Sequence, residues 1–206
     1  MAVHFHEEDL PAGVLAGTGA IAVDTETMGL VTARDRLCVV QLSDGSGNEH
    51  LVRFGPNSSY DAPNLKAVLA DPERLKLMHF ARFDVAVIHQ FLGVWATPVF
   101  CTKIASKLVR TYTDRHGLKD LLKETLGVEI SKQQQSSDWG AAELSEAQKE
   151  YAASDVRYLH RAHEVLERRL AREGRTHIAQ ACFDFLATRA ELDLVGWAEQ
   201  DIFAHL

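Results

Sequence analysis

Short apolar runs separated by polar turns occupy the first half of the chain and predict a β-rich region. The first run, Ala20–Val23, predicts a buried strand that ends at Asp24. Residues 36–43 and 49–54 predict two further strands, because the cluster Asp44–Asn48 between them consists of turn-forming residues. Three consecutive strands joined by short connections predict a meander.

Helical periodicity dominates further along the chain. We expect a helix over 65–69 that stops before Pro72, a strand over 75–79, a helix over 83–92 and a short strand over 99–102. Further helical segments are predicted over 103–110, 117–127, 145–173 and 175–193. Ser145 and Gln148 form a capping-box pattern at the start of the third of these segments. Residues 1–206 are therefore predicted to form one α/β domain, with a mixed central β-sheet flanked by helices and a helical C-terminal half.

Composition places the chain among soluble globular proteins and limits its partners. Of 206 residues, 46% are hydrophobic and 25% charged, and the formal net charge is −7, which discourages a long basic groove for nucleic acid. Cys38, Cys101 and Cys182 are odd in number and far apart, which is typical of reduced thiols. No leader and no membrane-spanning apolar run is evident, so we expect a cytoplasmic protein without a membrane partner.

Four acidic residues and a tyrosine are candidates for chemistry. Asp24 and Glu26 leave the same face of a strand, although acid-x-acid pairs should occur about four times by chance in this composition. Asp84 opens a helix, where an acid also stabilises the helix dipole. Asp155 follows Tyr151 by four residues, which places both on one helical face and is equally typical of an ordinary amphipathic helix. Each of these residues has an ordinary structural explanation. What is unusual is the order in which they occur along the chain: at a strand end, then at a strand-to-helix junction, then within a helix.

That order resembles the DEDD superfamily of 3′-to-5′ exonucleases, in the branch whose third motif contains a tyrosine. Asp24 and Glu26 match the first motif, Asp84 the second, and Tyr151 with Asp155 the third. The resemblance implies a ribonuclease H-like, DnaQ-like exonuclease fold and hydrolysis of nucleic acid from the 3′ end.

Within the superfamily the chain is similar to the ribonuclease D group. The similarity is carried by Gln135–Trp139 and by the string from Leu144 to Leu159, and it extends from about Ile21 to Leu166. Two positions depart from the group: Phe80 stands where relatives usually have Asn, and Ala142-Glu143 where many have Arg-Pro. Neither departure touches an implied metal ligand.

The resemblance implies two divalent cations, Mg²⁺ or Mn²⁺, bound by carboxylates, which are the ligands that these ions prefer. Asp24 would bridge both ions, Glu26 and Asp155 would complete the ion site that activates water, and Asp84 would hold the second ion. Tyr151, whose ordinary pKa is near 10, is assigned to orienting the water rather than to acting as a base.

A second set of residues is expected to contact substrate. Leu30 would act as a wedge against the terminal bases, unless it tucks under the sheet, and His79 would lie near the 3′ end. Trp139 either stacks on substrate or plugs the fold. The complete set of substrate candidates is Thr27, Met28, Gly29, Leu30, His79, Phe83, Gln135 and Trp139.

A narrower resemblance is to the alphaproteobacterial nano-RNase C group, which implies an octameric ring and very short RNA substrates, down to dinucleotides. The apolar stretch 194–206 is a candidate oligomerisation tail. Positive residues that could grip phosphates, or simply form a solvated helix face, are Lys103, Lys107, Arg110, Arg115, His116, Lys119 and Lys123. Alternatives are trimming of structured RNA such as tRNA precursors, an exonuclease of single-stranded DNA, and a non-catalytic nucleic-acid-binding module.

Overall fold

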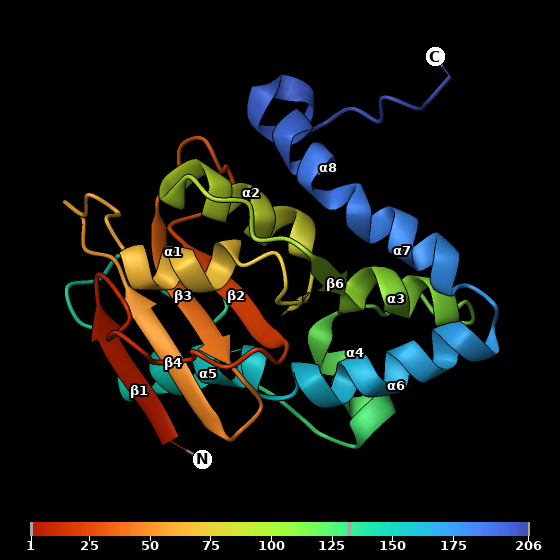
Figure 1. The fold of residues 1–206 in the computed structure, drawn as a ribbon, viewed down its shortest axis with the longest axis horizontal. Helices are drawn as coiled ribbons and strands as arrows, with labels where there is room; N and C mark the ends of the chain where they lie inside the picture. Colours follow the sequence, from red (N-terminus) through yellow and green to blue (C-terminus); the bar gives the residue numbers. More distant parts are fainter. Residues whose placement is uncertain (1, 132, 206) are drawn as a thin grey trace.

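The computed structural model describes residues 2–131 and 133–205, and a six-stranded mixed sheet forms its centre (Figure 1). The strands are β1 (Ala2–Glu7), β2 (Ile21–Thr27), β3 (Leu37–Ser43), β4 (Asn48–Arg53), β5 (Lys76–Met78) and β6 (Val99–Cys101). Their order across the sheet is β1-β4-β3-β2-β5-β6. β2, β3 and β4 pair antiparallel, which confirms the meander, and β5 and β6 extend the sheet in parallel beside β2.

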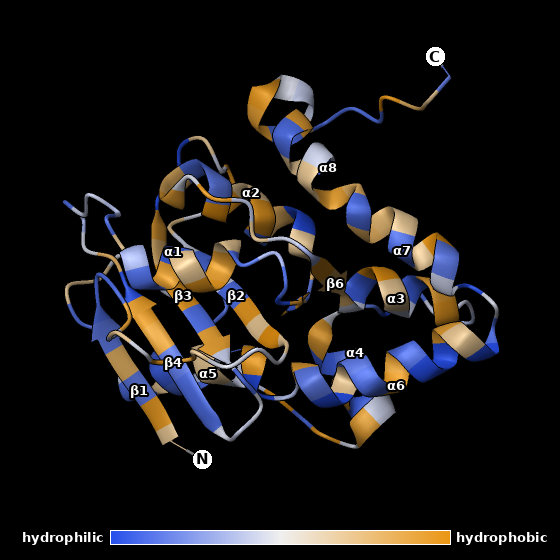
Figure 2. Ribbon diagram, viewed as in Figure 1, coloured by the Kyte–Doolittle hydropathy of each residue, from blue (hydrophilic) through white to orange (hydrophobic). Residues whose placement is uncertain are grey.

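Helices cover both faces of the sheet and form the C-terminal half. They are α1 (Pro63–Ala70), α2 (Ala81–Leu92), α3 (Thr102–Val109), α4 (Leu118–Leu126), α5 (Glu146–Arg157), α6 (Leu159–Arg172), α7 (Thr176–Asp184) and α8 (Leu186–Leu192), followed by a π-helical turn, η1 (Asp193–Trp197). α1 and α2 lie on one face and α5 on the other (Figure 1). Figure 2 shows that α2 is mainly hydrophobic and α6 mainly hydrophilic, as expected for a covered and a solvent-facing helix. Within the described residues, no helix is both long and apolar enough to cross a membrane.

The N-terminal strand β1 was not predicted from the sequence, which indicated no element before residue 20. β1 pairs in parallel with β4 at the edge of the sheet, and most of its side chains are exposed. His6 Nε2 lies 3.0 Å from His50 Nδ1, and Phe5 packs against the core on the α5 side. Because backbone pairing rather than an apolar pattern forms this strand, periodicity could not reveal it.

Two predicted helices are each divided in the structure. The segment 145–173 breaks at Tyr158, whose φ of −108° and ψ of 0° end α5. Tyr158 packs against a small core cluster that contains Leu122 and Ile130. The chain turns there, so that α6 leaves the sheet and packs on α3 and α4 (Figure 1). The segment 175–193 similarly becomes α7 and α8, joined at Phe185.

Helix α5 begins with the predicted capping box. The Gln148 backbone N–H donates to Ser145 Oγ at 3.3 Å, and the Ser145 backbone N–H donates to Gln148 Oε1 at 3.0 Å. These bonds satisfy two backbone donors that the first turn of a helix otherwise leaves unpaired. The cap therefore fixes the start of the helix that carries Tyr151 and Asp155.

We expect Ser145→Ala to lower the free energy of unfolding by about 1 kcal/mol, because it removes the hydroxyl that caps α5. Urea unfolding followed by circular dichroism measures this change. Ser136→Ala is the matched control at an exposed loop serine and should change stability by less than about 0.5 kcal/mol. Equal midpoints for the two variants would contradict the prediction.

Candidate active site

Strand β2 carries two acidic side chains on one face of the sheet. Successive residues of a strand point to opposite faces, so Asp24 and Glu26 share a face and Thr25 points to the other. The prediction that this strand ends at Asp24 is wrong. It continues to Thr27 because its backbone stays paired with β3, with an irregularity between Glu26 and Thr27. Both carboxylates therefore project from a paired strand and not from a loop.

Helix α5 brings a third acid, Asp155, against that face. Asp24, Glu26 and Asp155 each have a carboxylate oxygen, and these atoms lie within 4.8 Å of one another. Two residues beyond Asp155, Arg157 donates to Glu49 on β4 with an N···O distance of 3.2 Å, and the Glu49 side chain is only 1% exposed. This buried ion pair ties α5 to the sheet and so fixes the position of Asp155.

Helix α2 supplies the fourth acid, Asp84, which is 3% exposed. Thr25 Oγ1 donates to Asp84 Oδ1 at 2.7 Å. Thr25 lies between the two acids of β2 but points to the face covered by α2, so one strand contacts Asp84 on one side and presents Asp24 and Glu26 on the other. All four acids thus lie around the end of β2.

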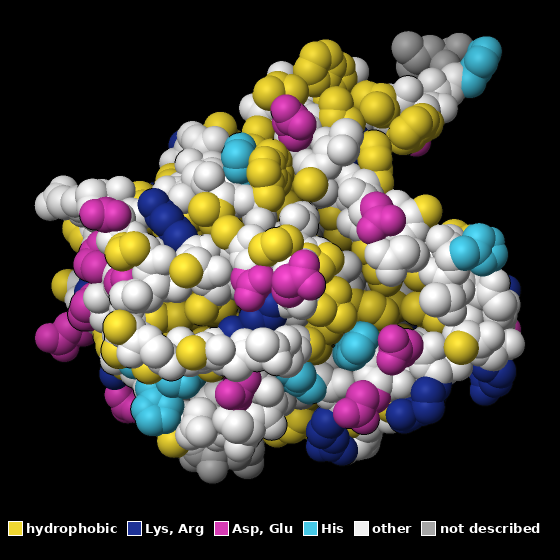
Figure 3. Space-filling view, in the orientation of Figure 1, with side chains coloured by type: hydrophobic (Ala, Val, Ile, Leu, Met, Phe, Trp, Pro, Cys, Tyr) yellow, Lys and Arg dark blue, Asp and Glu magenta, His cyan; other side chains and the backbone are white. Residues whose placement is uncertain are grey.

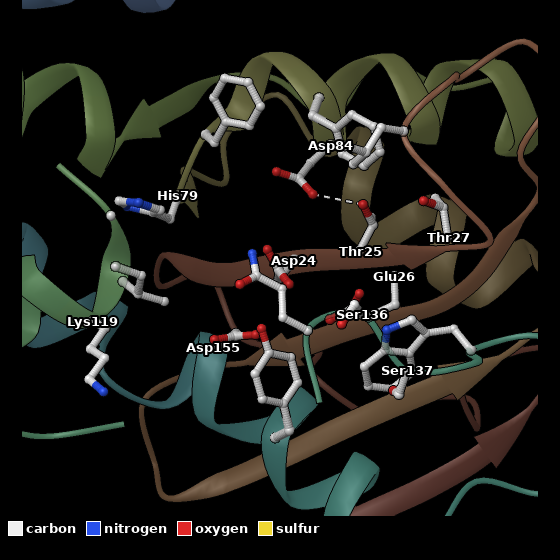
Figure 4. A pocket seen from close by; sticks show the side chains of 18 of the residues that line it. Asp24, Thr25, Glu26, Thr27, His79, Asp84, Lys119, Ser136, Ser137 and Asp155 are labelled. Carbon is white, nitrogen blue, oxygen red and sulfur yellow. Dashed lines mark hydrogen bonds between the residues drawn. The ribbon is translucent and has the colours of Figure 1, made fainter. Parts of the chain in front are cut away.

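The four acids line one cavity of about 610 Å³ (Figure 4). Figure 4 shows Asp24, Glu26 and Asp155 directed into a common space, with Asp84 facing them from α2. The same cavity is lined by Tyr151, Thr27, Met28, Gly29, Leu30, His79, Phe83, Gln135 and Trp139. The structure therefore brings together the complete set of residues that the sequence indicated, from segments more than 120 positions apart.

Comparison with known proteins identifies the family. A family model described as a 3′-5′ exonuclease matches residues 7–171. The chain belongs to this 3′-5′ exonuclease family. Ribonuclease D of Acidiphilium cryptum is 37% identical over 161 residues, which make up 78% of this chain and 40% of that protein. The chain thus spans less than half the length of the curated ribonuclease D relatives it matches.

Two solved structures of an exonuclease relative cover the entire chain. Brucella melitensis NrnC bound to pGG is 56% identical, with a TM-score of 0.95 and 100% of both chains covered. The same protein with bound Mg²⁺ is 56% identical, with a TM-score of 0.94 and the same coverage. These matches confirm the predicted exonuclease fold and the resemblance to the ribonuclease D and nano-RNase C groups.

The acids of this exonuclease site fit divalent cations. Four carboxylates converge on one cavity, and among the described residues no Lys or Arg forms an ion pair with any of them. Anions this close repel one another unless positive charge is supplied, and Mg²⁺ and Mn²⁺ prefer oxygen ligands. The donor set and the Mg²⁺-bound relative together support divalent cations as cofactors.

Burial raises the pKa of every acid in the site, and repulsion between carboxylates adds to this for Asp24, Glu26 and Asp155. The pKa values of Asp24 and Glu26 lie well above the ordinary range, first because both are buried and then because of the neighbouring carboxylates. Burial raises the pKa of Asp84 to about 7 and that of Asp155 to about 7. Burial, followed by the charge of Asp155, also raises the pKa of Tyr151. A tyrosine with a raised pKa is a poor base at neutral pH, which agrees with a positioning role.

Leu30 is presented to solvent at the rim of the cavity, with 86% of its surface exposed. The loop that carries it is held by the Thr27 hydroxyl, which donates to the Gly29 carbonyl, and by Asp35 Oδ2, which accepts the Val31 N–H at 2.9 Å. A Cβ atom on Gly29 would overlap the Asp35 carboxylate, so a larger residue here would have to displace the side chain that accepts the Val31 N–H. The alternative in which Leu30 tucks under the sheet is therefore wrong.

His79 and Trp139 lie in different environments within the cavity wall. His79 is half-buried, and its Nδ1 lies 2.9 Å from Thr102 Oγ1, which itself donates to the Met78 carbonyl. Trp139 is 3% exposed and packs in the core on the α5 side, with its ring centroid 6.0 Å from that of Tyr151. This burial favours the plug interpretation of Trp139 over an exposed stacking platform.

The predicted basic cluster divides into residues with different surroundings. Lys103 and Lys119 line the acidic cavity, and Lys107 does not. Arg110 is 2% exposed and bonds Glu124 at 2.6 Å, and Lys123 pairs with a glutamate. Within this cluster, Lys103 and Lys119 are thus the lysines that the structure places where they can contact a phosphate in this site.

Two features of the site were missed from the sequence. Thr25 is the hydroxyl that holds Asp84, and its position between two motif acids was a signal that could have indicated it. The Glu49–Arg157 pair joins residues 108 positions apart, and no local pattern marks either one. Such a pairing exists only after the sheet and α5 have come together.

Without divalent cations, the exonuclease should lose stability as the pH rises from about 5 to about 8. Asp84 and Asp155 have pKa values of about 7 in the folded protein, against an ordinary 3.8. The folded state therefore binds more protons than the unfolded state between these values, so the free energy of unfolding falls as the pH rises. Thermal unfolding in EDTA across this range measures the effect.

Mg²⁺ should restore the lost stability at the upper end of the range, because it binds the folded state. Asp84→Asn is the control: it should raise the Tm in EDTA at high pH and flatten the pH dependence. A wild-type Tm that stays constant or rises with pH in EDTA would show that the pKa values of Asp84 and Asp155 are not raised in the folded protein.

Proposed function

We propose that this protein is a metal-dependent 3′-to-5′ exoribonuclease that hydrolyses short oligoribonucleotides, down to dinucleotides, to 5′-mononucleotides. The observation that carries the proposal is the convergence of Asp24, Glu26, Asp84 and Asp155 on one cavity. A relative that matches the full length of the chain has been solved with the dinucleotide pGG, which supports a short substrate.

The proposed residue roles are those that the family resemblance implies, and the convergence of the acids on one cavity supports them. Asp24, Glu26 and Asp155 would hold one cation and Asp24 with Asp84 a second; when bound, these cations would lower the pKa of water and offset charge on the leaving oxygen. The water oxygen would bond to phosphorus as the bond from phosphorus to the 3′ oxygen breaks, which releases a 5′-mononucleotide and leaves a 3′ hydroxyl. Tyr151 lines the same cavity as Asp155 and would hold the attacking water in line.

The substrate would be held by contacts around the acids. Leu30 would separate the two terminal bases as an exposed apolar wedge, and His79 would contact the 3′ nucleotide. Thr27, Met28, Gly29, Phe83 and Gln135 would complete the wall, with Trp139 behind it. The three free thiols are consistent with the cytoplasmic location that we propose.

A second candidate function is trimming of structured RNA. It is favoured by the identity with ribonuclease D, whose members are more than twice as long as the aligned region. Single-stranded DNA remains a third candidate substrate, and non-catalytic binding of nucleic acid a fourth. Substrate length and sugar type separate these candidates directly.

The function is tested with a 5′-labelled diribonucleotide, a 20-nucleotide RNA and DNAs of matching sequence, each with Mg²⁺ and with EDTA. We expect Mg²⁺-dependent hydrolysis, fastest for the diribonucleotide. Asp24→Asn should lower the turnover of the diribonucleotide by about 100-fold or more, because the loss of one central contact to the transition state has an effect of this size. Asp61→Asn, at an exposed acid away from the cavity, is the matched control. Undiminished activity in Asp24→Asn would refute the metal site, and a preference for the long RNA would favour the ribonuclease D alternative.

We further propose that residues 194–206 contribute to a homo-oligomer, an octamer if the family resemblance extends to assembly; residue 206 lies outside the described residues. Apolar side chains gather at the outer end of α8 and on the segment that follows (Figure 3). Val195, Trp197, Ile202 and Phe203 are between 43% and 77% exposed. An apolar surface of this kind is typical of an interface.

The double change Trp197→Ser and Phe203→Ser should reduce the molar mass of the assembly, because it removes two aromatic contacts from the proposed interface. Light scattering coupled to size-exclusion chromatography measures it. Val3→Ser, at an apolar residue of β1 that is 36% exposed, is the control. If wild type is monomeric, or if the double variant keeps the wild-type mass, the tail is not an interface.

A further inference from the structure

A second cavity lies beside the acidic one, between the start of α2, helix α3 and the α7–α8 junction. Its volume is about 340 Å³. Apolar side chains such as Ile104, Phe185 and Leu186 form part of its wall. Arg82, Lys103, Lys107 and Arg189 also line it, and no acidic residue does so among the described residues. In a chain of net charge −7, a cavity lined by basic and apolar side chains favours an anionic ligand, provided that some of the basic groups are not already paired.

Two of the four cations are already neutralised within the protein. Arg82 Nε lies 2.6 Å from Asp193 Oδ2, and Arg189 Nη2 lies 2.6 Å from Asp193 Oδ1. Lys103 and Lys107 form no ion pair with any described residue, and burial together with the charge of Lys107 lowers the pKa of Lys103. The positive charge that no acid neutralises is therefore concentrated on α3, where Lys103 and Lys107 lie one helical turn apart.

Phe80 forms a wall that both cavities share, together with Lys103. It has a left-handed backbone conformation, with φ of 68° and ψ of 39°, which is uncommon for a bulky residue. Its ring is not buried, since 46% of the residue is exposed, and Lys103 Nζ lies 4.1 Å from the ring centroid. Packing does not account for an exposed aromatic ring held at this position. A ring beside an ammonium group suits a ligand that has both an aromatic and an anionic part.

We propose that the second cavity binds one nucleoside monophosphate unit, with the phosphate against Lys103 and Lys107 and the base against Phe80 and the apolar wall. The cavity is within the size range of small-molecule sites. The unit could have two sources with the same chemistry: the nucleotide upstream of the cleaved pair in an oligonucleotide of three or more residues, or a free 5′-mononucleotide. The first source rests on the proposed exonuclease function, and the second does not.

Lys107 gives the sharpest test because it lines the second cavity and not the acidic one. The experiment compares wild type, Lys107→Gln and Lys107→Glu in two assays: kcat/KM for di-, tri- and tetraribonucleotides with Mg²⁺, and calorimetric binding of 5′-AMP in EDTA. Lys66→Gln, on α1 and outside both cavities, is the matched control.

Loss of one charge-assisted contact should weaken binding by about tenfold in Lys107→Gln and more in Lys107→Glu. If the upstream nucleotide occupies the cavity, this loss appears in tri- and tetranucleotide turnover while dinucleotide turnover is unchanged. If a free mononucleotide occupies it, the loss appears in 5′-AMP affinity, even if wild type hydrolyses no oligonucleotide and the proposed function fails.

Lys107 variants that match wild type in both assays would overturn the proposal. The proposal would also be overturned if light scattering showed a changed molar mass for the Lys107 variants while their nucleotide binding stayed at the wild-type level. That result would assign the cavity to contact with a second copy of the chain.

Discussion

The repulsion among four carboxylates in one cavity is the constraint on which the rest of this structure depends. Asp84 is almost fully buried, and the other three acids have oxygens within 4.8 Å of one another. Such an arrangement opposes folding unless the elements that carry the acids are held by other interactions. The fold supplies these through the paired strand β2, the Thr25 hydroxyl bonded to Asp84, and the ion pair between Arg157 and Glu49.

These interactions hold the acids from different directions. The positions of the acids are therefore fixed although no described Lys or Arg forms an ion pair with them. β2 is central in the sheet, and its backbone at Asp24 and Glu26 is paired with β3, which limits the freedom of the two acids. α5 is fixed at its start by the Ser145 cap and near its end by Arg157. The site therefore combines rigid ligands with unmet negative charge, the condition under which a divalent cation binds the folded state and stabilises it.

The distribution of positive charge is compatible with the action on short nucleic acid that we propose for this acidic protein. Arg110 and Lys123 are paired within the protein, and Lys103, Lys107 and Lys119 lie around the two neighbouring cavities. Among the described residues, no long basic stripe connects them to a distant surface. Because affinity for long nucleic acid grows with the number of phosphates contacted, the few lysines around these cavities favour the short substrate that we propose.

The sequence by itself determined the central meander and the start of α5, because these depend on local periodicity and a cap, and it singled out the four acids through the family resemblance that their order along the chain carries. It did not determine β1, whose exposed side chains give no apolar pattern, or the turn at Tyr158 that directs α6 away from the sheet. It also left open whether Leu30 is exposed and whether Trp139 is buried. Only the tertiary structure decided these points, and with them the Thr25–Asp84 and Glu49–Arg157 contacts and the second cavity, because each arises where segments distant in the chain meet.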